Sequence, residues 1–332
     1  FIADRKFTKK EQGLFEKNFG EKSTISMLSL LKISNPQSIE GRIKSVLDEA
    51  SNLLLQDRER LFKEIKQNVA LRVEEESSND TFKVSGRGEL HLTILIETMR
   101  REGYEFSISR PQVVLKKIND KTMEPEEFAI IDVEEQYMGP VMEAMGQRKG
   151  AMKNMIHAGT ESVRLEFVIP TRGLFGFRSQ LLTLTRGTGI LNHSFQDYVP
   201  YCGELARRKN GVLISLENGS TTQHSLFNLQ DRGVMFLGPA EEVYTGMIIG
   251  ENNKDNDLVV NICKGKKLTN VRASGSDDTV SIAPPRIMSL EQVLGYLNDD
   301  ELAEITPTSI RLRKRHLDEN ERKRAAKTQK VA

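Results

Sequence analysis

The order of secondary-structure patterns constrains the fold of this chain most, because one order occurs twice. Between residues 22 and 111 apolar residues alternate as in a strand, recur with helical spacing, and alternate again in two runs; a second helical pattern and a last strand pattern follow. The same order returns between residues 124 and 200. The order β-α-β-β-α-β is that of the ferredoxin-like fold. The sequence therefore predicts two tandem ferredoxin-like domains.

Individual elements can be predicted within each repeat. In the first repeat, we expect strands at Lys22–Ile33, 69–73, 82–84 and 106–108, and helices from about Ile43 and from Gly88 to Gly103. In the second repeat, we expect strands at Phe128–Val133, Ala151–His157, Val163–Ile169 and Gly189–Phe195, and helices at Gly139–Gly150 and Gly173–Thr185. The two repeats resemble each other in the order of their elements and not in their residues.

The pattern changes after about residue 205, where short strand patterns alternate with turn residues. The predicted strands are Val212–Ser215, Thr222–Asn228, Val243–Ile249, Leu258–Cys263, Val280–Ala283 and Ser309–Arg313. One helix is expected after Ser289, because Gln292 stands at the capping-box spacing. The basic tail should be a frayed helix or coil. The predicted fold class is α+β, with an unassigned segment (1–21), two ferredoxin-like domains (22–113 and 124–200), a β-rich domain (205–317) and the tail (318–332).

Composition narrows the classes of partner and compartment. The net charge is +1, from 48 Lys and Arg against 47 Asp and Glu, so any partner must be selected by a local patch. No apolar run approaches the roughly 20 residues of a membrane span. Two distant cysteines, Cys202 and Cys263, favour a reducing cytoplasm over a disulfide framework. The start at Phe1 suggests the later part of a longer protein, and a monomer suffices.

Motifs of catalysis and nucleotide binding are lacking. Gly265-Lys266-Lys267 has neither the hydroxyl residue nor the upstream glycine of a phosphate-binding loop, and Asn253–Asn256 ends in asparagine where a guanine reader needs aspartate. The five histidines are scattered, without HExxH, and no serine lies in GxSxG. We therefore predict no catalytic residues, no metal site and no cofactor in this chain.

Two basic features suggest nucleic acid, and each also has a purely structural interpretation. Residues 258–276 (LVVNICKGKKLTNVRASGS), called the cationic segment below, contain four cations and no acidic residue. Cations and donors on a flexible path suit a phosphate backbone, although a solvated loop would look the same. Thr171–Arg178 (TRGLFGFR) partly matches the RNP1 pattern of RNA-binding sheets. The alternative there is a turn with Phe175 and Phe177 packed in the core.

Several motifs carry a resemblance to a known family. They are SGRGELHL from Ser85, MRREGYE from Met99, SRP from Ser109, RGLFGFR from Arg172, LQDRG from Leu229, GKKLTN from Gly265, RASG from Arg272 and TPTSIRLRKR from Thr306. In this order, over about residues 69 to 320, they resemble the TypA/BipA family of translational GTPases. SGRGELHL alone would indicate only the wider elongation factor G class. Residues 1–21 match nothing in the family, and residues 35–57 replace an expected loop.

The resemblance implies a ribosome-associated GTPase whose GTP and Mg²⁺ sites belong to a preceding domain that this chain lacks. It also implies ferredoxin-like domains similar to the third and fifth domains of elongation factor G, followed by a family-specific domain that binds the ribosome. Large-subunit rRNA and the tRNA acceptor end would be the partners of its basic loop. The RNA-binding residues expected on this ground are Lys264, Lys266, Lys267, Asn270, Arg272, Ser274, Arg313, Lys314 and Arg315. Arg87, Glu89 and His91 would couple the domains.

The predicted function is therefore the ribosome- and RNA-docking portion of such a GTPase, acting in translation or ribosome assembly under stress. Two other classes stay open. One is a stand-alone single-stranded RNA binder that stacks bases on Phe175 and Phe177. The other is a protein- or membrane-surface module acting through the Arg311–Lys330 tail. An enzyme acting by itself is the least favoured class.

Overall fold

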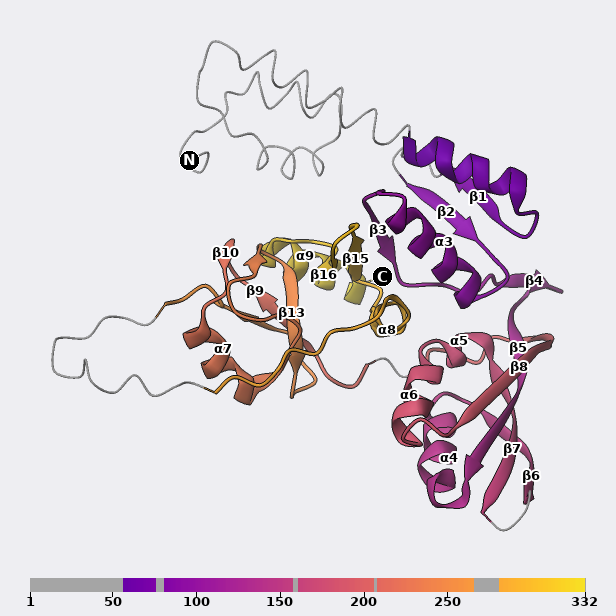
Figure 1. Cartoon of the computed structure of the whole chain (residues 1–332). Coiled ribbons are helices and arrows are strands. Elements are labelled where there is room, and N and C mark those ends of the chain that lie inside the picture. Colours follow the sequence, from indigo (N-terminus) through magenta and orange to yellow (C-terminus); the bar gives the residue numbers. More distant parts are fainter. Residues whose placement is uncertain (1–55, 76–80, 158–160, 206–207, 266–280, 332) are drawn as a thin grey trace, which may run out of the picture. The chain divides into compact units, whose positions relative to one another are not determined.

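The computed structural model describes residues 56–75, 81–157, 161–205, 208–265 and 281–331, and it divides the chain into two compact units, residues 1–87 and 88–332 (Figure 1). The α+β class is confirmed. The segment 1–21, the strand expected at Lys22–Ile33 and the start of the helix expected from Ile43 lie outside the described residues. Within those residues, no helix has the length and apolar content that a bilayer crossing requires.

The described part of the first unit is a helix followed by a hairpin. The chain is helical through 56–67, and β1 (Arg72–Glu75) pairs antiparallel with β2 (Phe82–Ser85). The strand expected from residue 69 begins later, because the backbone N–H of Leu71 donates to the carbonyl of Asn68 and closes a turn there. The predicted turn between the two strands falls at residues 76–80, which are not described.

The second unit opens with a helix and a strand whose partner comes from the far end of the chain. Helix α3 (Glu89–Arg101) buries Leu95 and Met99 and ends where Gly103 adopts a positive φ of 97°. Strand β3 (Phe106–Ser109) then pairs antiparallel with β15 (Glu301–Ile305), about two hundred residues later. The sequence predicted this strand but not its partner.

Residues 121–200 form the expected ferredoxin-like sheet. Strands β5 (Lys121–Glu134), β6 (Ala151–His157), β7 (Ser162–Pro170) and β8 (Ile190–Pro200) lie in the antiparallel order β8-β5-β7-β6. The short β4 (Lys116–Ile118) pairs antiparallel with the start of β5. Helices α4 (Met138–Gln147), α5 (Thr171–Leu174) and α6 (Phe177–Leu184) cover one face (Figure 1). The single helix expected at Gly173–Thr185 is two, because Gly176 adopts a positive φ of 67°.

Alternate residues of β5 and β7 build the core of this sheet. Ala129, Ile131 and Val133 face the helices from β5, and the β7 residues Val163, Leu165, Phe167 and Ile169 do the same. Burial of alternate residues agrees with the strands that the sequence predicted here, although Val168 and Pro170 at the end of β7 are buried on the other face as well. A short helix, η2 (Glu135–Tyr137), joins β5 to α4.

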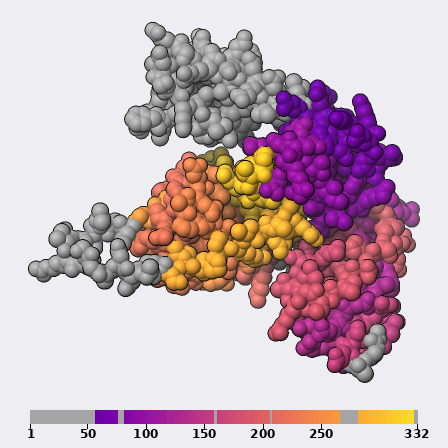
Figure 2. Space-filling model, viewed as in Figure 1, coloured from indigo at the N-terminus to yellow at the C-terminus, as the bar shows by residue number. Residues whose placement is uncertain are grey.

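The C-terminal part is a larger sheet buried on both faces. Its strand order is β14-β9-β13-β16-β15-β3, with β11 beside β13. The strands are β9 (Val212–Ser215), β11 (Gly233–Met235), β13 (Met247–Asn252), β14 (Leu258–Val260) and β16 (Ile310–Lys314); β10 (Gly219–Ser220) and β12 (Glu242–Val243) pair separately. Strand β14 runs parallel to β9, and the other pairs are antiparallel. In Figure 2 its orange and yellow residues form one packed body.

Two helices cover the two faces of this sheet. Helix α8 (Leu290–Tyr296) packs Val293 and Leu294 into one cluster with Ile248, and its predicted capping box, Ser289 with Gln292, is confirmed. Helix α7 (Gln223–Leu229) packs Leu226 into the other cluster with Ile249. Neighbouring residues of one strand, such as Ile248 and Ile249, thus pack into hydrophobic clusters on opposite faces of the sheet. This explains apolar runs such as VLIS at β9, because a sheet covered on both faces has no polar side.

Three predictions for this part need correction. The strand expected at Thr222–Asn228 is α7, because Thr222 caps a helix whose residues Leu226 and Leu229 are buried on one side. No strand occurs at the described residues 281–283, and Val243–Ile249 is divided between β12 and β13 by Gly246, which has a φ of 85°. The tail is the helix α9 (Glu319–Val331), and η3 (Gln230–Arg232) follows α7.

Candidate nucleic-acid interface

Helix α7 holds the point where the cationic segment leaves the sheet. After β14 the chain runs to Lys264 and Gly265, both exposed. The carbonyl oxygen of Lys264 accepts hydrogen bonds from Thr222 Oγ1 at 2.8 Å and from Ser225 Oγ at 2.7 Å. The first cation of the segment therefore has a fixed backbone and an exposed side chain. Lys266, Lys267, Asn270, Arg272 and Ser274 lie outside the described residues.

A residue directly after α7 also binds the chain at Ala283, beyond the cationic segment. The backbone N–H of Ala283 donates to Gln230 Oε1 at 3.2 Å, directly after α7. Lys264 and Ala283 are thus both tied to residues 222–230. Thr222, Ser225 and Gln230 were not among the residues expected from the sequence, because Thr222–Asn228 was predicted to be a strand. The available signal was Thr222 at a capping position, followed by Leu226 and Leu229 at helical spacing.

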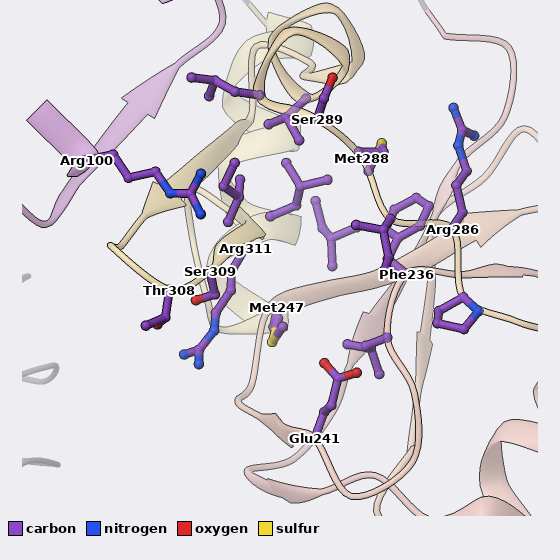
Figure 3. Close-up of a pocket in the computed structure, with 18 of the residues that line it drawn as sticks. Arg100, Phe236, Glu241, Met247, Arg286, Met288, Ser289, Thr308, Ser309 and Arg311 are labelled. Atoms are coloured by element: carbon purple, nitrogen blue, oxygen red, sulfur yellow. The ribbon is translucent and has the colours of Figure 1, made fainter. Parts of the chain in front are cut away.

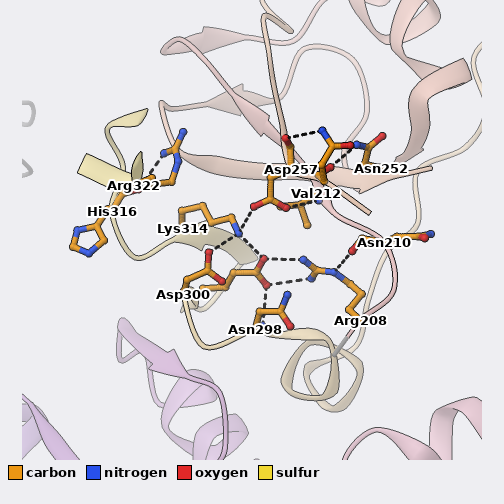
Figure 4. Close-up of polar contacts among 12 residues, drawn as sticks. Arg208, Asn210, Val212, Asn252, Asp257, Asn298, Asp300, Lys314, His316 and Arg322 are labelled. Atoms are coloured by element: carbon orange, nitrogen blue, oxygen red, sulfur yellow. Dashed lines mark hydrogen bonds and ion pairs between the residues drawn. The ribbon is translucent and has the colours of Figure 1, made fainter. Parts of the chain in front are cut away.

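Lys314 is buried and paired with carboxylates. Its side chain is 2% exposed, and Nζ lies 2.7 Å from Asp257 Oδ2, 2.8 Å from Asp300 Oδ2 and 3.0 Å from Glu301 Oε1 (Figure 4). Burial alone would lower the pKa of Lys314, but the carboxylates of Glu301, Asp300 and Asp257 outweigh it and hold the pKa above its usual value. An ammonium group placed this way is not available to a phosphate.

Glu301, which is fully buried, joins Lys314 to a second cation. Arg208 Nη1 donates to Glu301 Oε2 at 3.1 Å and Arg208 Nη2 donates to Oε1 at 2.9 Å, and the backbone N–H of Asn298 also donates to Oε2. Arg208 is held further by the ring of Tyr296, 4.3 Å from the guanidinium carbon. The group ties β15, β16 and the chain before β9 together, so its role is structural.

The neighbours of Lys314 have different surroundings. Arg313 Nε lies 2.7 Å from Glu304 Oε1, and the exposed Arg315 extends beyond the end of β16. Successive residues of a strand point to opposite faces, so the run RLRKR cannot present all its cations to one partner. Of the three predicted residues, Arg315 has the most accessible side chain.

The three predicted coupling residues fall in different places. Arg87 ends the first unit, whereas Glu89 and His91 lie in the first turn of α3. One carboxylate oxygen of Glu89, Oε1, is buried without a hydrogen-bond partner. Burial, aided by the nearby Glu291, raises the pKa of Glu89 to about 7, and the Gly176 N–H and Arg148 oppose this shift. The charged form of the Glu89 carboxyl group is therefore disfavoured at this position in the second unit.

The RNP1-like residues are part of a packed turn. Phe177 is fully buried in the core of the ferredoxin-like sheet, and Phe175 is half-buried. Arg148 Nη1 donates to the carbonyls of Gly173 and Phe175 at 2.8 and 2.9 Å and holds the turn closed. The structural interpretation of Phe177 is thus confirmed, and base stacking on it is excluded because its ring has no exposed face.

An open groove of about 830 Å³ lies between α3 and the C-terminal sheet (Figure 3). Met247, Phe236 and Met288 give it an apolar floor, and Arg100 and Arg311 stand on one side, with Glu241 elsewhere on the rim. Its lining carries charges of both signs. In the described parts of the chain, no three His, Cys, Asp or Glu side chains come together as a metal-binding group.

Two family models match the second unit, and they meet between its two sheets. Residues 121–209 match the family model of the elongation factor G C-terminus, and residues 210–319 match that of the TypA/BipA C-terminal domain. The first match covers the ferredoxin-like sheet, and the second covers the larger sheet except β3, together with the cationic segment.

Relatives that share one name occur in several bacteria. The large ribosomal subunit assembly factors BipA of Salmonella typhimurium and Escherichia coli K12 are 56% and 55% identical to this chain over 273 residues, and that of Bacillus subtilis is 54% identical over 275 residues. Each alignment covers 82% of this chain and 45% of the relative, so the chain spans about half the length of these relatives. Together with the TypA/BipA motifs in its sequence, this similarity shows that the chain belongs to the TypA/BipA family.

Proposed function

We propose that this chain is the ribosome-docking portion of a TypA/BipA-like GTPase that acts in translation or in assembly of the large ribosomal subunit under stress. The observation that carries the proposal is the acid-free cationic segment, rooted on α7 within the region matched to the TypA/BipA C-terminal domain. The relatives are named for large-subunit assembly, which supports the ribosome as partner. The cytoplasm is the compartment that fits this role, and a monomer suffices for it.

In this proposal the chain binds RNA and breaks no bond. Lys264, Lys266, Lys267 and Arg272 neutralise phosphates of large-subunit rRNA and of the tRNA acceptor end, and Asn270 and Ser274 donate hydrogen bonds to them. Arg315 adds a contact from the end of β16, whereas Arg313 is paired with Glu304 and Lys314 with three carboxylates. The surface is therefore proposed without Lys314. GTP and Mg²⁺ would be bound by another domain of the intact protein.

Coupling of the nucleotide state to docking is proposed to pass through α3. Arg87, Glu89 and His91 lie at or just before its start, and β3 follows it and hydrogen-bonds to β15 in the C-terminal sheet. A displacement of α3 that carries β3 with it would act on this sheet, because β3 is hydrogen-bonded to β15.

Charge reversal in the cationic segment tests the docking proposal. We expect Lys266→Glu with Lys267→Glu to weaken co-sedimentation with purified large subunits at least tenfold, with an unchanged melting temperature. Lys117→Glu with Lys121→Glu is the matched control, since both lysines are exposed on the β4–β5 hairpin and change the net charge equally. Equal affinities of the two double variants would remove the segment from the interface.

Neither alternative class gains support from the described residues. Phe177 is buried, which leaves the stacking hypothesis without one of its two rings. Helix α9 is charged along the side chains that are described, and its small residues there are Ala325 and Ala326, so it has no broad apolar face for a bilayer. Deletion of residues 318–332 followed by binding to anionic vesicles would test the membrane hypothesis.

A further inference from the structure

The outer face of α7 has features that its packing does not explain. Leu226 and Leu229 point into the core, whereas Gln223, His224, Phe227 and Asn228 are exposed. Gln223 and Phe227 are four residues apart, as are His224 and Asn228, so the four side chains lie on one side of the helix. The ring of Phe227 is 41% exposed, and Asn228 Nδ2 lies 3.1 Å from His224 Nε2. An exposed phenyl ring therefore sits beside two planar polar groups.

The position of this face indicates the chemistry of its partner. The helix that presents it holds Lys264 through Thr222 and Ser225 and is followed by Gln230, which binds Ala283. The exposed ring thus lies on the element that anchors an acid-free cationic stretch of chain. An exposed cation and an exposed aromatic ring held by one helix match single-stranded RNA, since phosphates bind cations and a base stacks on the ring. A neutral apolar peptide would gain nothing from the cations.

We propose that the outer face of α7 is a base-stacking site, in which Phe227 stacks against one unpaired RNA base while Lys264 binds an adjacent phosphate. His224 and Asn228, which are paired with each other on the same exposed face, would hydrogen-bond the edge of that base. The inference rests on the proposed RNA-docking function and extends it from phosphate contacts, which carry no sequence information, to a contact with a base.

Two variants of Phe227 and one control test the site in the full chain. We expect Phe227→Ala to weaken binding to purified large subunits by about 5- to 150-fold, the range for one stacked base, and Phe227→Tyr to retain affinity. Phe195→Ala is the control, since Phe195 is 60% exposed in the ferredoxin-like part. The melting temperature of Phe227→Ala should stay near that of the parent chain, which excludes loss of fold.

A cycle with modified RNA separates a base contact from other causes. Binding of a twelve-nucleotide oligouridine is compared with that of oligomers carrying one abasic position, moved stepwise along the strand. If Phe227 stacks on a base, an abasic position at that base and Phe227→Ala should each weaken binding. Combined, they should lower the binding free energy by less than the sum of the two separate losses. Equal losses with intact and abasic RNA would overturn the inference, as would weakened large-subunit binding with unchanged oligomer binding, which indicates a ribosomal protein as partner.

Failure of the stacking site and failure of the docking proposal give different results. If Lys266→Glu with Lys267→Glu abolishes binding while Phe227→Ala has no effect, docking through the cationic segment stands and the stacking site is wrong. If the parent chain fails to bind large subunits and oligouridine even at low salt, both proposals are wrong.

Discussion

At the scale of single residues, Lys314 and Arg315 are adjacent cations with different surroundings. Lys314 is 2% exposed and contacts three carboxylates, and Arg315 is exposed. A basic run in a strand therefore contains both structural and accessible cations, and substitution of each should report a different property of the protein.

Lys314→Met should destabilise the chain by about 3 kcal/mol. This is the lower end of the range for breaking a buried ion pair, because Arg208 still neutralises Glu301. Urea unfolding gives the value, and Arg315→Met, which removes an exposed charge, should change the free energy of unfolding by no more than about 0.5 kcal/mol. Loss of ribosome binding by Lys314→Met at unchanged stability would place Lys314 in the interface instead.

Glu89 makes stability depend on pH. Its pKa is raised to about 7 in the folded state by burial and by Glu291, so the folded state binds a proton more tightly than the unfolded state does. Stability is then full below the unfolded pKa near 4.5 and falls as the pH rises to 7. Removal of this carboxylate should therefore increase the stability of the folded state only at high pH.

Glu89→Gln should raise the melting temperature at pH 8 by about 2–4 °C and leave it unchanged at pH 4.5. The size corresponds to about 1 kcal/mol in a unit of this length, after discounting for partial solvent screening. Thermal unfolding at the two pH values tests it, with Glu105→Gln, an exposed carboxyl after α3, as the control. A shift of equal size at both pH values would show that the change acts through packing and not through charge.

At the scale of elements, both helices of the C-terminal sheet begin at hydroxyl caps. Ser289 Oγ accepts from the Gln292 backbone N–H, and Gln292 Oε1 accepts from the Ser289 backbone N–H. Thr222 caps α7 in a similar way and also binds Lys264. Local sequence sets where these helices start, and their buried leucines set which face packs.

Ser289→Ala should lower the free energy of unfolding by about 1 kcal/mol, since the backbone N–H of Gln292 loses its acceptor, Ser289 Oγ, at the start of α8. The change is measured by urea unfolding. Thr308→Ala, at an exposed hydroxyl on the rim of the groove, is the comparison and should have little effect. Equal stability of the parent chain and Ser289→Ala would mean that tertiary packing alone fixes the helix start.

At the scale of the whole molecule, the charges nearly cancel, with a net charge of +1. Long-range attraction to RNA is therefore weak, and local contacts should dominate the salt dependence of binding. In addition, β3 and β15 join segments about two hundred residues apart, so the second unit depends on contacts that are distant in the sequence.

The salt dependence of large-subunit binding should count the phosphate contacts. Log affinity is expected to fall with log salt by about 0.7–0.9 per contact, and Lys264→Gln should reduce the slope by about 1. Co-sedimentation over a salt series measures this, with Lys117→Gln as the control. A slope that does not change on Lys264→Gln would remove that residue from the phosphate contacts.

The sequence by itself determined the ferredoxin-like order of residues 121–200, the capping box of α8 and the TypA/BipA motifs. These depend on short-range periodicity and on local residue identity, and a single chain displays both directly. The cations from Lys264 onward were likewise visible as a run without acidic residues.

Tertiary structure alone decided the rest. The apolar residues of Thr222–Asn228 fit a strand or a helix, and packing of Leu226 and Leu229 against the sheet selected the helix. Lys314 is buried because β15 and the chain before β9 bring Glu301 and Asp257 to it, and β3 pairs with β15 for the same long-range reason. A partner distant along the chain leaves no local signature, since periodicity shows that a face is buried and not against what.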